Sequence, residues 1–73
     1  MSVLRRYRYD ARLSRRELAR EAGVSHETIR QIERGRVPSA AVAGKLADAL
    51  SRYGIEIAPS DLLPADLTDR EAP

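Results

Sequence analysis

Two helix signatures separated by only three residues lie within residues 14–35 and constrain the fold more than any other feature of the sequence. Ser14 is a favourable N-cap, and Glu17, three residues later, completes the pattern of a capping box. Gly23 is the residue type that commonly follows a helix end in the left-handed conformation. Ser25 then serves as the N-cap of a second helix, which we expect to stop at the next glycine.

The short spacing between these helices determines how they cross. Two helices joined by a three-residue turn that contains glycine cross steeply and do not lie antiparallel. One helix then braces the domain while the other projects from it. The pattern therefore predicts a helix-turn-helix, with helix 26–34 as the element that enters the major groove of DNA.

Hydrophobic periodicity predicts further helices at residues 2–12 and 40–52. Residues 55–57 alternate like a strand but have no partner strand, so we expect an extended link whose isoleucines cover the core. A last short turn is expected at residues 59–63. Because Phe and Trp are absent, the core must be aliphatic and Ala-rich, helped by one of the three tyrosines. These are Tyr7, Tyr9 and Tyr53.

The length of 73 residues allows one domain with a small core. We therefore predict an all-α protein, a compact bundle of about five short helices. The domain is expected to cover residues 1–63, and residues 64–73 are expected to form an acidic, flexible tail.

The charge of the chain is unevenly distributed. Residues 1–52 have a balance of +6, whereas residues 53–73 have a balance of −4, and 12 of the 13 basic residues are arginines. Arginine has a planar fork suited to phosphates and guanine edges, although an arginine bias can also reflect genome composition. The basic body favours a polyanionic partner.

Several function classes receive no support from the residues present. The chain has no cysteine, so disulfides and thiolate metal sites are excluded. No apolar run is long enough to span a membrane or resembles a signal peptide. No nucleophile–base pair, metal cluster or phosphate loop is visible. We expect a cytoplasmic protein that is not an enzyme and needs no metal, cofactor or small-molecule ligand.

The exposed face of helix 26–34 follows from its angular positions. At about 100° per residue, one set of polar side chains falls within roughly 140°. Ile29 and Ile32 lie on the other side and are expected to anchor the helix to the core. The polar face offers groups suited to base edges. Its members are His26, Glu27, Arg30, Gln31 and Arg34.

A pair of charged residues lies at the border of two apolar faces. Glu33 is next to the buried side of its helix, so we expect it to be partly buried and to need a cation. Arg8 follows Tyr7 at the edge of the apolar stripe of the first helix. It is a candidate partner for an acid on another helix.

The segment L-S-R-R-E-L-A-R-E-A-G-V-S-H-E-T-I-R-Q-I-E-R-G, followed by P-S and K-L-A-D-A-L, resembles the Xre/Cro-type helix-turn-helix family of phage and bacterial repressors. The resemblance covers about residues 4–63 and implies a lambda-repressor-like fold. It implies base contacts from His26, Glu27, Arg30 and Gln31. Phosphate contacts are expected from Arg15, Arg34, Arg36 and Ser39. It also implies an ion pair between Arg8 and Glu33.

Simpler roles remain open for three of these side chains. Arg30 is expected to bind guanine in bidentate fashion, the alternative being a solvated helix residue. His26 contacts a base or phosphate, or simply occupies the first helical turn. Glu27 accepts from the amino group of cytosine, or only favours the helix N-terminus electrostatically.

The predicted function is sequence-specific binding of double-stranded DNA for transcriptional control, as a repressor that occludes a promoter. A homodimer on an inverted-repeat operator would supply the specificity that one small domain lacks. The segment after the fourth helix could form the dimer surface or simply complete the core. Its apolar residues are Ile55, Ile57, Leu62 and Leu63.

Two other functions fit parts of the sequence. An antitoxin-like or other protein-interaction module would use the acidic C-terminal tail to bind a partner. An architectural or excision factor would bend DNA without controlling a promoter.

Overall fold

The computed structural model describes residues 2–64, and in this range all regular secondary structure is helical, without strands. The all-α class is therefore confirmed. The elements are α1 (Val3–Asp10), α2 (Arg15–Ala22), α3 (His26–Glu33), α4 (Ala40–Ser51) and the 3-10 turn η1 (Pro59–Leu62). The predicted tail lies almost wholly outside the described residues.

The expected number of about five helices needs correction, because only four of the elements within residues 2–64 are α-helices. The fifth is the four-residue turn η1, in which the N–H groups of Asp61 and Leu63 bond carbonyls three residues earlier, as in a 3-10 helix. It begins at Pro59, whose missing N–H is tolerated in a first turn. The Asp61 carboxylate accepts a hydrogen bond from the backbone N–H of Ala58 at 2.9 Å and closes the turn.

Each α-helix starts at a serine N-cap, and α1 begins one residue later than the periodicity predicted because Ser2 is its cap. The four hydroxyl oxygens accept backbone N–H groups three residues later, at distances of 3.0 to 3.2 Å. These serines are Ser2, Ser14, Ser25 and Ser39.

The helix ends were predicted slightly too late. Helix α1 stops at Asp10, two residues early, because Arg12 adopts a left-handed φ of 60°. The N–H of Leu13 then bonds the carbonyl of Arg8 at 3.1 Å, which closes the helix in the manner of a glycine C-cap. Arg34 and Arg52 are C-caps and not helical residues.

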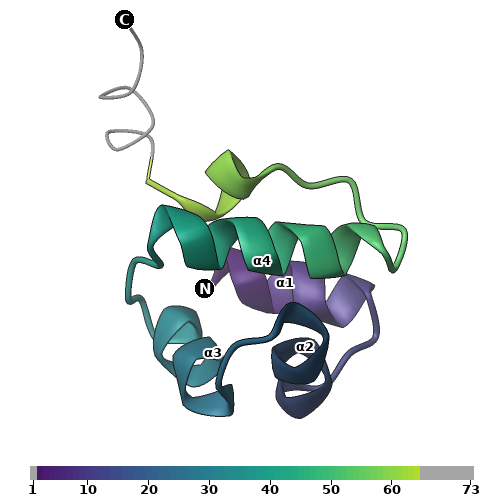
Figure 1. The fold of residues 1–73 in the computed structure, drawn as a ribbon, viewed down its shortest axis with the longest axis horizontal. Coiled ribbons are helices and arrows are strands. Elements are labelled where there is room, and N and C mark those ends of the chain that lie inside the picture. Colours follow the sequence, from purple (N-terminus) through teal and green to yellow (C-terminus); the bar gives the residue numbers. More distant parts are fainter. Residues whose placement is uncertain (1, 65–73) are drawn as a thin grey trace, which may run out of the picture.

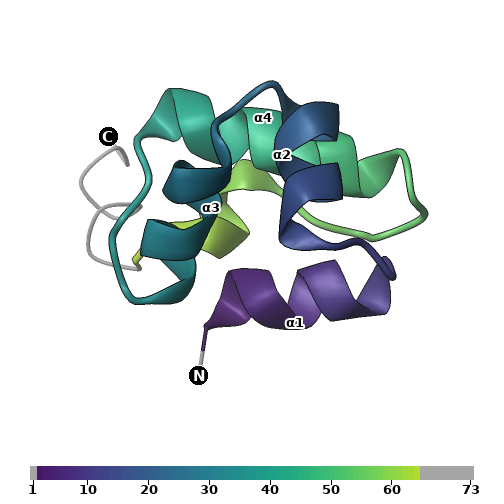
Figure 2. The same ribbon diagram turned by 90° about the horizontal axis from the view of Figure 1, so that it is seen from below.

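The core joins all four α-helices through aliphatic side chains. Helices α2 and α3 lie side by side on one face of α4, and the chain after α4 returns across the other face of α4 to η1 (Figures 1 and 2). The fully buried large side chains are Leu4, Leu18, Ile29, Leu46 and Leu50. The helix-turn-helix is thus held at one side of the bundle with its outer surface uncovered.

The tyrosines and the link after α4 divide into core and surface residues. Tyr7 packs against the core, whereas Tyr9 and Tyr53 are 57% and 43% exposed and do not contribute to it as Tyr7 does. Ile55, Ile57 and Leu62 are partly buried against the core of their own chain. Core packing therefore accounts for most of the apolar surface that the sequence had also offered to a dimer.

None of the helices within residues 2–64 has the length and apolar character needed to cross a membrane.

Candidate nucleic-acid interface

A capping box fixes the start of α2, the first helix of the α2–α3 pair. The Ser14 hydroxyl accepts from the N–H of Glu17 at 3.0 Å, and the Glu17 carboxylate accepts from the N–H of Ser14 at 2.8 Å. These bonds favour the charged carboxylate, so the pKa of Glu17 is lowered. Gly23 has a φ of 73°, which glycine adopts without steric cost. Only three residues therefore separate the end of α2 from the start of α3.

Helix α3 is anchored on one side and open on the other. Ile29 and Ile32 are buried, at 0% and 8% exposure. His26 and Glu27 are exposed on the first turn, and Arg30 and Gln31 are partly exposed. The four residues that the sequence assigned to base contacts thus lie outside the core, on a helix whose other face fixes its position.

Three of these four side chains are linked to one another through Glu27. Arg30 donates from Nη1 to Glu27 Oε1 at 3.0 Å, and Gln31 donates from Nε2 to Glu27 Oε2 at 3.3 Å. Arg36 donates in turn to Oε1 of Gln31. We call these four residues, Glu27, Arg30, Gln31 and Arg36, the surface network. It orients the side chains of α3 before any ligand arrives.

A second network lies at the other end of α3, between α1 and α2. Arg8 donates from Nε to Glu33 Oε2 at 2.6 Å, and Arg15 donates from Nε to Glu33 Oε1 at 2.9 Å. The side chains of Arg8 and Glu33 are only 7% and 4% exposed, whereas that of Arg15 is 41% exposed. Arg8 also donates from Nη1 to the carbonyl of Leu13 at 3.1 Å. We call Arg8, Arg15 and Glu33 the buried network.

The charge state of Glu33 follows from two opposing effects. Burial raises the pKa of this carboxyl, but the hydrogen bonds and positive charges of Arg8 and Arg15 lower it by more. The net direction is downward, so the carboxylate is ionised at neutral pH. It bridges three helices as an anion.

The residues assigned to phosphate contacts occupy different positions. Arg34 and Arg36 are exposed just after α3. Arg15 belongs to the buried network, and its exposed part faces solvent. The Ser39 oxygen accepts from the N–H of Val42 at 3.1 Å as an N-cap, which leaves its hydroxyl proton available. The role of Arg15 in the buried network was missed, because only the crossing of α2 and α3 brings it to Glu33.

The steep α2–α3 pair with an open polar face defines a class, the helix-turn-helix DNA-binding domains. A family model described as "Helix-turn-helix" matches residues 4–56, which is most of the chain. The chain belongs to this Xre/Cro-like helix-turn-helix family, whose domain indicates a DNA-binding transcription regulator. Comparison with curated proteins and with solved structures gave no match in either case.

Proposed function

We propose that this protein is a cytoplasmic, sequence-specific DNA-binding repressor that inserts α3 into the major groove and blocks a promoter. The observation that supports this most strongly is the open face of α3. It presents base-reading groups on a helix held rigidly by Ile29 and Ile32. These groups belong to His26, Glu27, Arg30 and Gln31.

Arginines around this face supply the affinity for the DNA backbone. Arg15, Arg34 and Arg36 flank α3 on the chain segments before and after it. Each phosphate that they neutralise releases counterions, so binding weakens as salt increases. The Ser39 hydroxyl adds a neutral donor beside the same loop. Backbone contacts of this type fix the register of the helix, whereas the side chains of α3 select the sequence.

A homodimer on an inverted repeat is part of the proposal. One domain of this size contacts few base pairs, and two copies about one helical turn apart would read twice as many. Because Ile55, Ile57 and Leu62 pack on their own core, the dimer surface must rely on their exposed edges and on Leu63.

Selection from randomised duplex DNA, with the bound fraction sequenced and the affinity measured across salt, tests this function. We expect an enriched inverted repeat. Arg30→Ala should weaken binding to it by about 1–3 kcal/mol and relax the preference at one base pair. Arg6→Ala removes the same charge from an exposed position on α1 and is the matched control.

Two results would reject the proposal. Salt-sensitive binding without an enriched motif would indicate an architectural protein, because only backbone contacts would remain. No binding at low salt would exclude DNA as the partner.

A further inference from the structure

A hollow of about 390 Å³ lies at the junction of α1, α2 and α3, and arginines dominate its lining. We call it the arginine hollow. It is lined by Arg5, Arg15, Arg30, Glu33 and Arg34. Four guanidinium groups from three helices and the end of α3 thus surround one carboxylate.

Glu33 does not neutralise this hollow. Its two oxygens already accept hydrogen bonds from Arg8 and Arg15, and the Arg8 charge adds to the positive side. Arg34 forms no ion pair with any of residues 2–64. The remaining positive charge therefore favours an anion that approaches from solvent.

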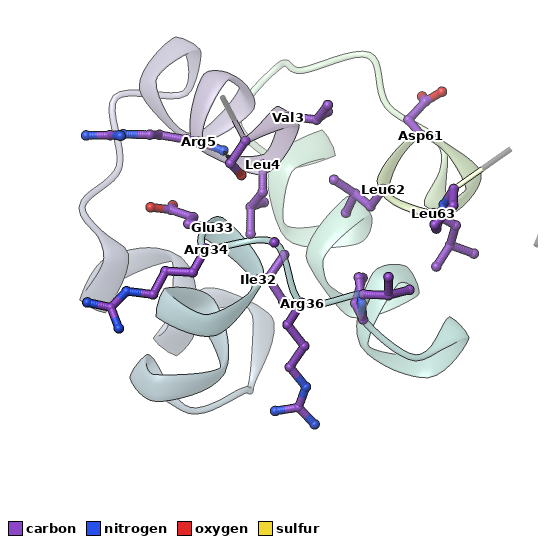
Figure 3. Close-up of a pocket in the computed structure, with 15 residues that line it drawn as sticks. Val3, Leu4, Arg5, Ile32, Glu33, Arg34, Arg36, Asp61, Leu62 and Leu63 are labelled. Carbon is purple, nitrogen blue, oxygen red and sulfur yellow. Dashed lines mark hydrogen bonds between the residues drawn. The ribbon is translucent and has the colours of Figure 1, made fainter.

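Arg5 reaches this hollow from α1, outside the helix-turn-helix. In Figure 3, the side chains of Arg5 and Arg34 extend to the same side of the molecule, with the carboxylate of Glu33 between them. Figure 3 draws the residues that line a neighbouring hollow, which reaches from the start of α1 to η1. Its volume is about 460 Å³. The guanidinium of Arg36 points away from both Arg5 and Arg34.

The guanidinium of Arg5 is held in place by Tyr9, but only one of its nitrogens donates a hydrogen bond in the described part of the chain. Its Nε donates to the Tyr9 hydroxyl at 3.1 Å, and its Cζ lies 5.5 Å from the centre of the Tyr9 ring. Within residues 2–64 this is its one side-chain hydrogen bond, so both Nη groups are free to donate. Two forked N–H donors of this type match the oxygens of a phosphate.

We propose that the arginine hollow binds a phosphate group of the DNA backbone, and that Arg5 and Arg34 are the side chains that hold it. This inference rests on the proposed function and extends its interface onto α1. Arg5 and Arg8 both lie over the ring of Tyr9, with their Cζ atoms 5.5 and 4.8 Å from its centre, so the proposed phosphate contact adjoins the buried network.

The test compares Arg5→Gln with Arg6→Gln, which removes the same charge from the next residue of α1. Arg6 is exposed and borders a different hollow, formed with Val3, Tyr7 and Asp10. Binding is measured on the selected operator and on random duplex, from low to high salt. Arg5→Gln should weaken both by the same factor, roughly 3- to 10-fold, and reduce the salt slope by about 1. Arg6→Gln should weaken binding less than about twofold.

Operators in which single phosphates are replaced by methylphosphonates locate the contact. At one position the wild type and Arg6→Gln should lose more affinity than Arg5→Gln, which has only Arg34 left to hold that phosphate. Equal losses for Arg5→Gln and the wild type at every position would overturn the inference. A change of the selected motif in Arg5→Gln would also overturn it, because base reading would then be involved.

Two further measurements separate the remaining explanations. Thermal unfolding of Arg5→Gln should match that of Arg6→Gln, so that a loss of binding is not a loss of fold. Titration with inorganic phosphate alone should show weak binding, and tight binding would assign the hollow to a free anion in place of DNA. Absence of DNA binding by the wild type would reject the proposed function itself.

Discussion

Helix α3 carries two glutamates, six residues apart, whose carboxylates both accept hydrogen bonds from arginine. Glu33 belongs to the buried network and has a side-chain exposure of 4%, whereas Glu27 belongs to the surface network and has an exposure of 58%. The donor–acceptor distances are similar, at 2.6 and 2.9 Å for Glu33 and 3.0 Å for the Arg30 bond of Glu27. The two carboxylates therefore differ in burial and not in the length of their hydrogen bonds.

This difference predicts different consequences for the same chemical group. A buried charge that loses its partner keeps its desolvation cost, whereas an exposed one is solvated by water. The buried network should therefore hold α1, α2 and α3 together. The surface network should contribute little stability and instead set the directions of Arg30 and Gln31. One helix thus uses a carboxylate for folding at one end and for recognition at the other.

The largest expected effect is on stability. Glu33→Gln should lower the free energy of unfolding by about 3 kcal/mol, because Arg8 then remains buried without a full counter-charge. Glu27→Gln, the matched control on the same helix, should change it by less than about 0.5 kcal/mol. Urea denaturation followed by circular dichroism measures both. A Glu33→Gln loss below 0.5 kcal/mol would remove the distinction between the two networks.

The next effect concerns DNA binding and has an unusual sign. Glu27→Ala should raise the affinity for random duplex roughly fivefold, since removing one carboxylate near a phosphate is worth about 1 kcal/mol. The same change frees Arg30 and Gln31, so the selected motif should become less defined. Fluorescence anisotropy on random and selected duplexes measures both affinities and hence their ratio. Weaker binding to random DNA would show that Glu27 does not act in this way.

The smallest effect is on the pH dependence of stability. The pKa of Glu33 is lowered in the folded state below its ordinary value of 4.5. Its stabilisation is therefore present above that pH and is lost as the pH falls through the folded-state pKa. In Glu33→Gln this contribution should be missing, so stability should depend less on pH below 4.5. Measuring the free energy of unfolding at decreasing pH for the wild type, Glu33→Gln and Glu27→Gln tests the sign of this pH dependence.

The sequence predicted the helix starts because their signals are local. A serine followed by favourable helix residues is enough to position a start, and Gly23 in the same way positions the turn. The left-handed Arg12 carried no such signal, since glycine normally occupies that conformation. A short turn was predicted at residues 59–63, but the total of about five helices was slightly too high, because sequence spacing does not distinguish four residues of 3-10 geometry from an α-helical turn.

Contacts between helices were harder to predict. The position of Glu33 beside the buried face of α3 indicated that it would need a cation. The sequence offered Arg8 through its place beside Tyr7, but Arg15 reaches the same carboxylate only through the crossing of two helices. Arg5 was assigned no role in the predicted site. A signal was present, because Arg5 lies three residues before Arg8 and therefore on nearly the same side of the helix.

Each of the first three helices is only eight residues long. Isolated helices shorter than about 12–15 residues are marginal in water, so a fragment that lacks any of the four helices should not keep α3 folded. The reading surface therefore exists only in the intact bundle, and loss of any helix should abolish it completely. A protease that captures the transiently unfolded chain would end DNA binding in one step and leave no partly active remnant.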